Sequence, residues 1–321
     1  MKLKPFSRLA VGLTAAALAL SACGGSNNTD NANASEGGGS LSGAVKADGS
    51  STVAPLTTAA AELFKEEQPG VNVTVGTSGT GGGFEKFCAG ETDISDASRP
   101  IDDADEAPLC EEAGIEYAEI PVANDALTVV VSTENDWVDC LTTEQLKAIW
   151  EPGSKVSSWK DLDPGFPDEE LELFGPGTDS GTFDYFTDVI NGEEGASRED
   201  YSPSEDDNVI VQGVSGSSGG LGYFGYTYFE ENSDTLKALE IDSGDGCVAP
   251  SAETAQDGSY TPLSRPLFIY PAKASVEKPQ VKAFLEFYLE NDADIAEAAQ
   301  FIPLNDEQKS EAQSAYDSLV G

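Results

Sequence analysis

The stretch that decides the fold is Asp48-Gly49-Ser50-Ser51-Thr52-Val53-Ala54-Pro55. The residues before it, 44–47, have the character of a short strand, and the residues after it, 54–67, are predicted to form a helix. Pro55 fits the first turn of that helix, because its fixed φ is helical and its missing N–H would have no partner there. A strand, a turn of small residues and a helix make up the unit from which α/β folds are built.

The same design recurs along the chain. Turns rich in Gly, Ser and Thr also occupy 76–84, 95–100 and 175–183. Periodicity predicts strands and helices in alternation, which indicates parallel sheets covered by helices on both faces. The predicted strands are 71–75, 92–95, 116–122, 126–132, 170–174, 222–226 and 267–270; the helices are 54–67, 83–89, 143–150, 182–190 and 278–290, with further helix to the C-terminus, and 209–214 is a helix start or a strand.

These turns have the composition of an anion-binding site. A helix N-terminus offers unpaired backbone N–H groups and the positive end of the helix dipole. Glycine lets the backbone approach a ligand closely, and Ser or Thr adds a hydroxyl donor, so no net positive charge is needed. One such turn is weak evidence, because Ser and Thr commonly cap helices. Several in one chain favour a shared ligand.

The N-terminus indicates export. Residues 1–22 combine Lys and Arg with a short apolar run, as in a signal peptide. The end of that run, Leu20-Ser21-Ala22-Cys23-Gly24, resembles a bacterial lipobox, which implies cleavage before Cys23 and its acylation, including palmitate. The alternative is an ordinary signal peptide with an incidental cysteine. Residues 23–43 are then the acylated cysteine and a polar, flexible tether.

Four further cysteines remain, at 88, 110, 140 and 247. An even number in an exported chain predicts two disulfides. Three pairings are possible; we favour Cys88–Cys110, which are close in sequence, and therefore Cys140–Cys247. Free buried thiols are the alternative.

Charge and composition exclude several classes of protein. The chain has 17 basic and 58 acidic residues, a formal charge of −41, and no histidine. Such acidity disfavours nucleic acid and anionic membrane surfaces as partners. The absence of histidine excludes Ser-His-Asp and Cys-His catalysis and His-ligated zinc. No cofactor or metal is expected, and a bound anion must be held by local hydrogen bonds.

Over nearly the whole of the exported part, the sequence resembles the phosphate-binding proteins of high-affinity phosphate ABC importers, the PstS type. The resemblance is carried by residues 49–55, 81–84, 93–101, 141–150, 175–186 and 219–223. It implies an α/β, type II periplasmic-binding-protein fold, with two lobes joined by hinge strands around a ligand cleft. We expect lobe one at 44–123 plus 265–321 and lobe two at 124–264.

The resemblance also implies the phosphate ligands. Ser51, Thr52, Thr80 and Gly81 would donate from lobe one, and the Ser98-Arg99 pair marks a further contact. Ser180, Gly181 and Thr182 match the phosphate turn of lobe two.

The chain departs from the family pattern at one cation. Pro176 stands where some members have an arginine shortly before the Ser-Gly-Thr turn. A guanidinium suits a tetrahedral oxyanion because its planar fork binds two oxygens. Arg99 is our first candidate and Arg198 our second; a salt bridge is the alternative for each.

A buried carboxylate would explain a preference for phosphate over sulfate, because only phosphate keeps a proton to donate to it near neutral pH. Asp96 and Asp125 are the candidates.

Rival functions are less well supported. Asp179-Ser180-Gly181 matches an aspartic-protease string, but it leads into a predicted helix, whereas those enzymes carry the motif on a β loop, so an enzyme is not expected. The same scaffold could bind sulfate or molybdate, hydrolyse phosphate esters, or act as a sensor. The prediction is a monomeric, extracytoplasmic lipoprotein that binds inorganic phosphate and passes it to permease and ATPase subunits.

Overall fold

The computed structural model describes residues 40–178 and 180–321. The predicted signal peptide, Cys23 and most of the tether lie outside the described residues, as does Asp179. The strands are β1 (Gly43–Gly49), β2 (Val71–Gly76), β3 (Ile94–Ala97), β4 (Ile120–Ser132), β5 (Cys140–Thr142), β6 (Glu172–Pro176), β7 (Ser202–Ser204), β8 (Gly220–Gly225), β9 (Leu236–Ala238), β10 (Glu240–Asp242), β11 (Cys247–Val248) and β12 (Ser264–Pro271).

The helices alternate with these strands along most of the chain. They are α1 (Ala54–Glu67), α2 (Gly79–Cys88), α3 (Ala107–Ala113), α4 (Thr143–Trp150), α5 (Trp159–Leu162), α6 (Gly181–Phe186) with the π-helical η1 (Thr187–Asn191), α7 (Asp207–Ser215), α8 (Tyr226–Glu231), α9 (Ala252–Gln256), α10 (Lys273–Val276), α11 (Pro279–Glu290), α12 (Asp292–Ala298) and α13 (Asp306–Val320). The predicted helices at 54–67 and 143–150 are confirmed, and the undecided segment at 209–214 is part of helix α7.

The main sheet is mixed, so the prediction of parallel sheets is confirmed for the strand pairs at its two sides and wrong for its middle. Its strand order is β2-β1-β3-β12-β4-β8-β6-β7, with β9 paired to β4. The pairs at either side are parallel, β1 with β2 and β3, and β6 with β7 and β8. In the middle, β12 and β4 are antiparallel to each other and to their other neighbours, because the chain leaves along β4 and returns along β12.

β4 is one strand of 13 buried residues and not the two strands predicted at 116–122 and 126–132. The polar residues that suggested a break have partners in the fold. The backbone of Asn124 exchanges two hydrogen bonds with Ile302 (2.8 and 3.0 Å), and Asp125 forms an ion pair with Arg265. With those groups satisfied, the strand continues through both halves of the sheet.

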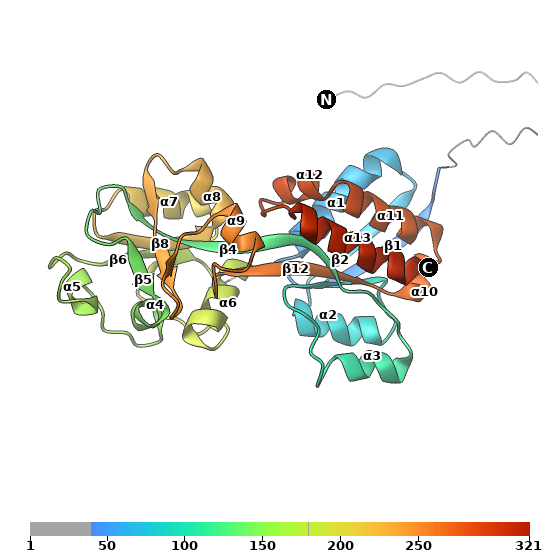
Figure 1. Cartoon of the computed structure of the whole chain (residues 1–321), viewed down its shortest axis with the longest axis horizontal. Coiled ribbons are helices and arrows are strands. Elements are labelled where there is room, and N and C mark those ends of the chain that lie inside the picture. Colours follow the sequence, from blue (N-terminus) through green and yellow to red (C-terminus); the bar gives the residue numbers. More distant parts are fainter. Residues whose placement is uncertain (1–39, 179) are drawn as a thin grey trace, which may run out of the picture. The chain divides into compact units, whose positions relative to one another are not determined.

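Most of the helices and strands form two groups, one toward each end of β4 and β12 (Figure 1), and each group contains one large hydrophobic core of described residues. The first core takes its residues from 45–123 and 267–319, and the second core takes its residues from 127–263. β4 and β12 lie side by side between them, as the pairing of residues 120–126 with 264–269 requires. Only these two strands of the sheet link the two sets of core residues, among the residues described.

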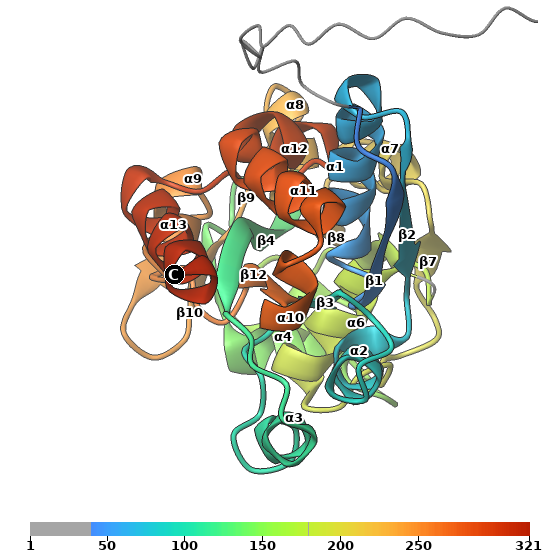
Figure 2. The same cartoon turned by 90° about the vertical axis from the view of Figure 1, so that its right-hand side faces the viewer.

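Alternating side chains on the linking strands explain why helices cover both faces. On β12, Leu267 and Ile269 belong to the first core with α1, α11 and α12, whereas Phe268 and Tyr270 pack on the other face against α2. Successive strand residues point to opposite faces, so a strand buried on both sides has no polar alternation. Figure 2 shows α1, α11 and α12 on one side of these strands and α2 and α3 on the other.

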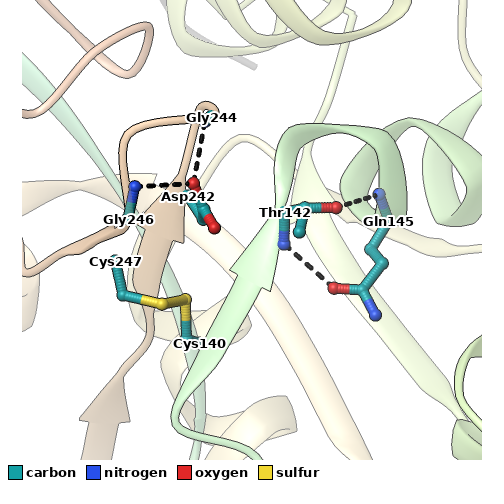
Figure 3. Close-up of a disulfide and its surroundings, with 7 residues drawn as sticks. All are labelled: Cys140, Thr142, Gln145, Asp242, Gly244, Gly246 and Cys247. Atoms are coloured by element: carbon teal, nitrogen blue, oxygen red, sulfur yellow. Dashed lines mark hydrogen bonds between the residues drawn. A yellow bond between two sulfur atoms is a disulfide. The ribbon is translucent and has the colours of Figure 1, made fainter.

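Two disulfides join segments of the structure, and both favoured pairings are confirmed. Cys88 at the end of α2 is bonded to Cys110 in α3, and Cys140 of β5 is bonded to Cys247 of β11. The second bridge spans 107 residues of sequence and ties together the small sheet β11-β10-β5 (Figure 3). Beside it, the Asp242 carboxylate accepts hydrogen bonds from the N–H groups of Gly244 and Gly246, which closes the turn into β11.

Within residues 40–178 and 180–321, no helix combines the length and apolar character that a membrane crossing requires.

Candidate functional site

A cavity of about 470 Å³ opens beside the linking strands. Three turns next to the first core supply one wall, helix α6 and its continuation supply the opposite wall, and β12 lies between them. The wall from the first core consists of Ser50, Ser51, Thr52, Ser78, Gly79, Thr80, Gly81, Gly82, Ser98, Arg99 and Pro100; the other residues are Gly181, Asp184, Tyr185, Asp188, Val189, Glu194, Arg265 and Pro266. In a chain with 58 acidic residues, no carboxylate is among the described residues of the first wall.

The turn before α1 is held against its neighbours by backbone contacts. Gly49 has φ +148°, and a β-carbon there would lie 2.1 Å from the carbonyl oxygen of Asp96, so a side chain cannot fit. The N–H of Ser50 donates to that same carbonyl at 2.8 Å. The Ser50 hydroxyl then accepts from the N–H of Thr52 at 3.2 Å, which directs the turn toward the cavity. The close fit explains why this turn needs glycine followed by small residues.

Helices α1 and α2 begin at the first wall of the cavity without a capping side chain among the described residues. Val53 precedes α1 and cannot cap it, and Ser78 precedes α2 but its hydroxyl is hydrogen-bonded to Asp48. The first N–H groups of a helix need acceptors, and they carry the positive end of the helix dipole. Both helix starts are therefore suited to an anion in the cavity.

The third turn places Ser98 and Arg99 beside α2. The N–H of Ser98 donates to the Thr80 hydroxyl at 3.2 Å, and the two hydroxyls of Thr80 and Ser98 lie 3.1 Å apart. Arg99 lines the cavity, but its fork is bound to both carboxylate oxygens of Glu106 at 2.7 Å, and its side chain is 47% exposed. The Glu106 bond raises the pKa of Arg99 further.

The opposite wall approaches the first at Gly181. A β-carbon on Gly181 would lie 2.8 Å from the Thr52 hydroxyl oxygen, so the start of α6 is in contact with the turn before α1. Ser180 caps α6 by accepting from the N–H of Thr182 at 3.2 Å. The two turns that the sequence assigned to separate lobes therefore meet at one edge of the cavity.

Arg265 is a second cation at the cavity, and it is not among the residues that the sequence predicts. It lies on β12, its side chain is 17% exposed, and its guanidinium lines the cavity. The available signal is weak: Arg265 is one of four arginines in the chain and lies two residues before the apolar run 267–270. The position of its side chain depends on Asp125, 140 residues away in sequence, and on other contacts that no local sequence pattern indicates.

Some of the predicted site residues do not line this cavity. Arg198 is buried elsewhere, where it donates to the carbonyls of Ile149 and Val156 and pairs with Asp200, so it terminates and braces α4. Asp96 has no exposed surface and faces Thr57 behind the turn. Thr182 and Asp125 instead line a neighbouring hollow of about 210 Å³.

The pKa values of Asp96, Asp125 and Asp184 are all raised, but their surroundings differ. Burial raises the pKa of Asp96 to about 7, with Thr57 lowering it and Asp48 raising it; one of its oxygens has no hydrogen-bond partner among the described residues. Burial also raises the pKa of Asp125, against the attraction of Arg265. At the cavity itself, burial and Glu194 raise the pKa of Asp184, which accepts no hydrogen bond from a described side chain, while Arg265 lowers it.

The arrangement can bind an anion, and it lacks the parts of the common hydrolytic sites. The chain has no histidine, so a Ser-His or Cys-His pair is excluded. Among the described residues, the one grouping with metal-ligand spacing is Cys140, Glu240 and Cys247, and its two sulfurs are joined in a disulfide. The cavity offers N–H, hydroxyl and guanidinium donors, the kind of groups that recognise oxyanions, and its opposite wall also carries Asp184, Asp188 and Glu194.

Known proteins are similar to this chain over most of its length. A family model described as a PBP superfamily domain matches residues 34–292. Protein SphX of Synechocystis sp. is 48% identical over 266 residues, covering 82% of this chain and 79% of SphX. The phosphate-binding protein PstS of Staphylococcus saprophyticus is 41% identical over 318 residues, covering 98% of this chain and 94% of that protein.

A solved structure is similar over nearly the same range. The crystal structure of a possible phosphate-binding protein from Planctomyces limnophilus matches with a TM-score of 0.83 and 47% identity, and it covers 88% of this chain and 100% of the other. The fold is therefore the type II periplasmic-binding-protein fold, as the sequence predicted. From its sequence, its fold and its cavity, this chain belongs to the PstS-type phosphate-binding proteins of the PBP superfamily.

Proposed function

We propose that this chain binds inorganic phosphate outside the cytoplasm and delivers it to an ABC importer. The observation that carries the proposal is the first wall of the cavity. In a chain of net charge −41, eleven described residues from three turns meet there without a carboxylate, and two helices begin there uncapped. Relatives named as phosphate-binding proteins support the choice of anion.

The ligands in this proposal are those predicted residues that line the cavity. Seven of them would bind the ion directly. They are Ser51, Thr52, Thr80, Gly81, Ser98 and Arg99 on the first wall and Gly181 on the opposite wall. Ser180 and Thr182 shape the turn on which Gly181 lies. Multiple backbone and hydroxyl donors can hold a dehydrated oxyanion although the protein's overall field repels it.

Two lobes then close around the ion. Lobe one comprises 44–123 plus 265–321 and lobe two comprises 124–264, which corresponds to the division between the two cores. Donors from both lobes bind one ion, so phosphate stabilises the closed arrangement, and this is the form that the permease and ATPase subunits receive.

The export route is part of the same proposal. Residues 1–22 direct export, Cys23 carries the lipid, including palmitate, and 23–43 tether a monomeric binding protein to the outer face of the membrane. The protein is a carrier and not an enzyme; the absence of histidine supports this choice.

Selectivity for phosphate over sulfate is assigned to Asp184. Asp96 is enclosed and Asp125 is paired with Arg265, whereas Asp184 lines the cavity. A carboxylate can accept the proton of phosphate but meets only lone pairs on sulfate.

The test is calorimetric titration of the purified protein with phosphate, sulfate and molybdate. We expect tight binding of phosphate alone, and we expect Asp184→Asn to reduce the preference for phosphate over sulfate by roughly tenfold or more. Asp234→Asn, at an exposed position away from the cavity, is the matched control. Preferred binding of sulfate or molybdate, turnover of a phosphate ester, or no phosphate binding at all would each overturn the proposal; unchanged selectivity in Asp184→Asn would overturn that assignment only.

A further inference from the structure

Arg265 contacts three segments that are far apart in sequence. Its Nε–H donates to Oδ2 of Asp125 on β4 at 3.2 Å. One Nη–H donates to the Thr52 hydroxyl at 3.2 Å, in the turn before α1. The guanidinium carbon lies 3.7 Å from the centre of the Tyr185 ring in α6. One side chain on a linking strand is thereby in contact with both walls of the cavity.

The donors of Arg265 are only partly used. A guanidinium has five N–H groups and no acceptor. Asp125 and Thr52 account for two of them, so three have no described protein acceptor. Because the side chain is only 17% exposed, leaving those groups without a partner is costly. They belong to a residue that lines the cavity, where an oxyanion can accept them.

The surroundings of Arg265 fix its orientation. Asp125 holds the Nε side, and the face of Tyr185 lies against the plane of the guanidinium. The Tyr185 hydroxyl in turn donates to the carbonyl of Pro262 at 2.6 Å, which holds the ring. An arginine whose plane is already set loses less entropy on binding two oxygens of one anion.

Arg99, the cation that the sequence favoured, is less well suited. Both of its terminal nitrogens donate to Glu106, one of them also donates to the carbonyl of Pro100, and the side chain is 47% exposed. Its fork is already closed by a carboxylate, whereas the Asp125 contact of Arg265 uses only the Nε edge.

We propose that Arg265 is the guanidinium that binds the oxyanion, and that it couples binding to the linking strands. This inference rests on the proposed function. Arg265 would take the place of the arginine that some family members have where this chain has Pro176. It lies on the strand that enters lobe one. An anion held by Arg265, the α1 turn and Gly181 bridges both lobes and the hinge at one point.

The first test is affinity. By calorimetry with inorganic phosphate, we expect Arg265→Gln to weaken binding by about a hundredfold or more, and Arg265→Lys, which keeps the charge but loses the fork, by about tenfold. Lys273→Gln is the charge-matched control, because Lys273 forms an exposed ion pair with Glu116 away from the cavity. Arg99→Gln is expected to have a smaller effect than Arg265→Gln.

The second test separates ligand contact from a purely structural role. The chain has four arginines, so the guanidinium signals of arginine-labelled full-length protein can be assigned one by one with the lysine variants. We expect phosphate to shift and slow the exchange of the Arg265 Nη protons, with little change at Arg198. This measurement remains informative if Arg265→Gln fails to fold.

The outcomes are distinct. If the wild-type protein binds phosphate and neither Arg265 variant is weakened, or the Arg265 signals do not respond, the inference is wrong and the proposed function stands. If the wild-type protein does not bind phosphate, the proposed function itself fails.

Discussion

At the scale of single residues, more of the predicted turn residues than of the predicted charged residues line the cavity. Ser51, Thr52, Thr80 and Gly181 could be found because a glycine-rich turn before a helix has a local signature. Arg265 has no such signature: its value depends on Asp125, 140 residues away, and on the Tyr185 ring. Interactions between distant segments are set by the fold, so a single sequence gives them little local trace.

Asp96 gives a prediction at the same scale. Its pKa is near 3.8 in an unfolded chain, whereas burial raises the pKa to about 7 in the folded protein. Between these values the folded protein keeps a proton that the unfolded chain has released, so a rise in pH favours unfolding. The destabilisation is absent below about pH 4, grows up to pH 7 and then stays constant.

Asp96→Asn cannot ionise but can still accept the hydrogen bond from Thr57. We expect its free energy of unfolding, relative to the wild-type protein, to increase by roughly 2.5 kcal/mol between pH 5 and pH 8 in urea titrations. Asp234→Asn should show no such change with pH. A stability difference for Asp96→Asn that is the same at both pH values would contradict the shifted pKa.

At the scale of elements, the sequence located most strands and helices but divided β4. Asn124 and Asp125 look like a break because they are polar within an apolar run. In the fold, Gln308 and the backbone of Ile302 satisfy Asn124, and Arg265 satisfies Asp125. A polar pair inside a buried strand therefore marks the crossing between the cores, where partners arrive from β12 and from the C-terminal segment.

The contact between two turns gives the prediction at this scale. A β-carbon on Gly181 would lie 2.8 Å from the Thr52 hydroxyl, so Gly181→Ala should hold α6 away from the α1 turn and weaken phosphate binding by about tenfold. Gly225→Ala is the matched control, because its nearest neighbour would be a Tyr228 ring carbon at 3.9 Å. Thr52→Ser combined with Gly181→Ala tests the cause: without the Thr52 methyl group the hydroxyl can turn aside, so binding should partly recover. Equal affinities for Gly181→Ala and Gly225→Ala would argue against close contact of the turns.

At the scale of the whole molecule, charge is the dominant property. A net charge of −41 makes the compact state repel itself, and added salt screens that repulsion, shortening the Debye length from about 10 Å at 0.1 M to about 3 Å at 1 M. We expect the urea midpoint at pH 7 to rise with sodium chloride over this range. At pH 4.5, where many carboxylates are protonated, the rise should be smaller. A salt response that is as large at pH 4.5 would mean that charge repulsion is not its source.

The two cores differ in how much of the chain must be made before each can form. The first core needs residues from both 45–123 and 267–319, whereas every member of the second core lies between 127 and 263. When the chain is made from its N-terminus, the second core can therefore form before α11 to α13 have been synthesised. The first core cannot be completed until those helices are present. We expect chains that stop before residue 267 to retain a protected central fragment and to expose β1 and β2 to proteolysis.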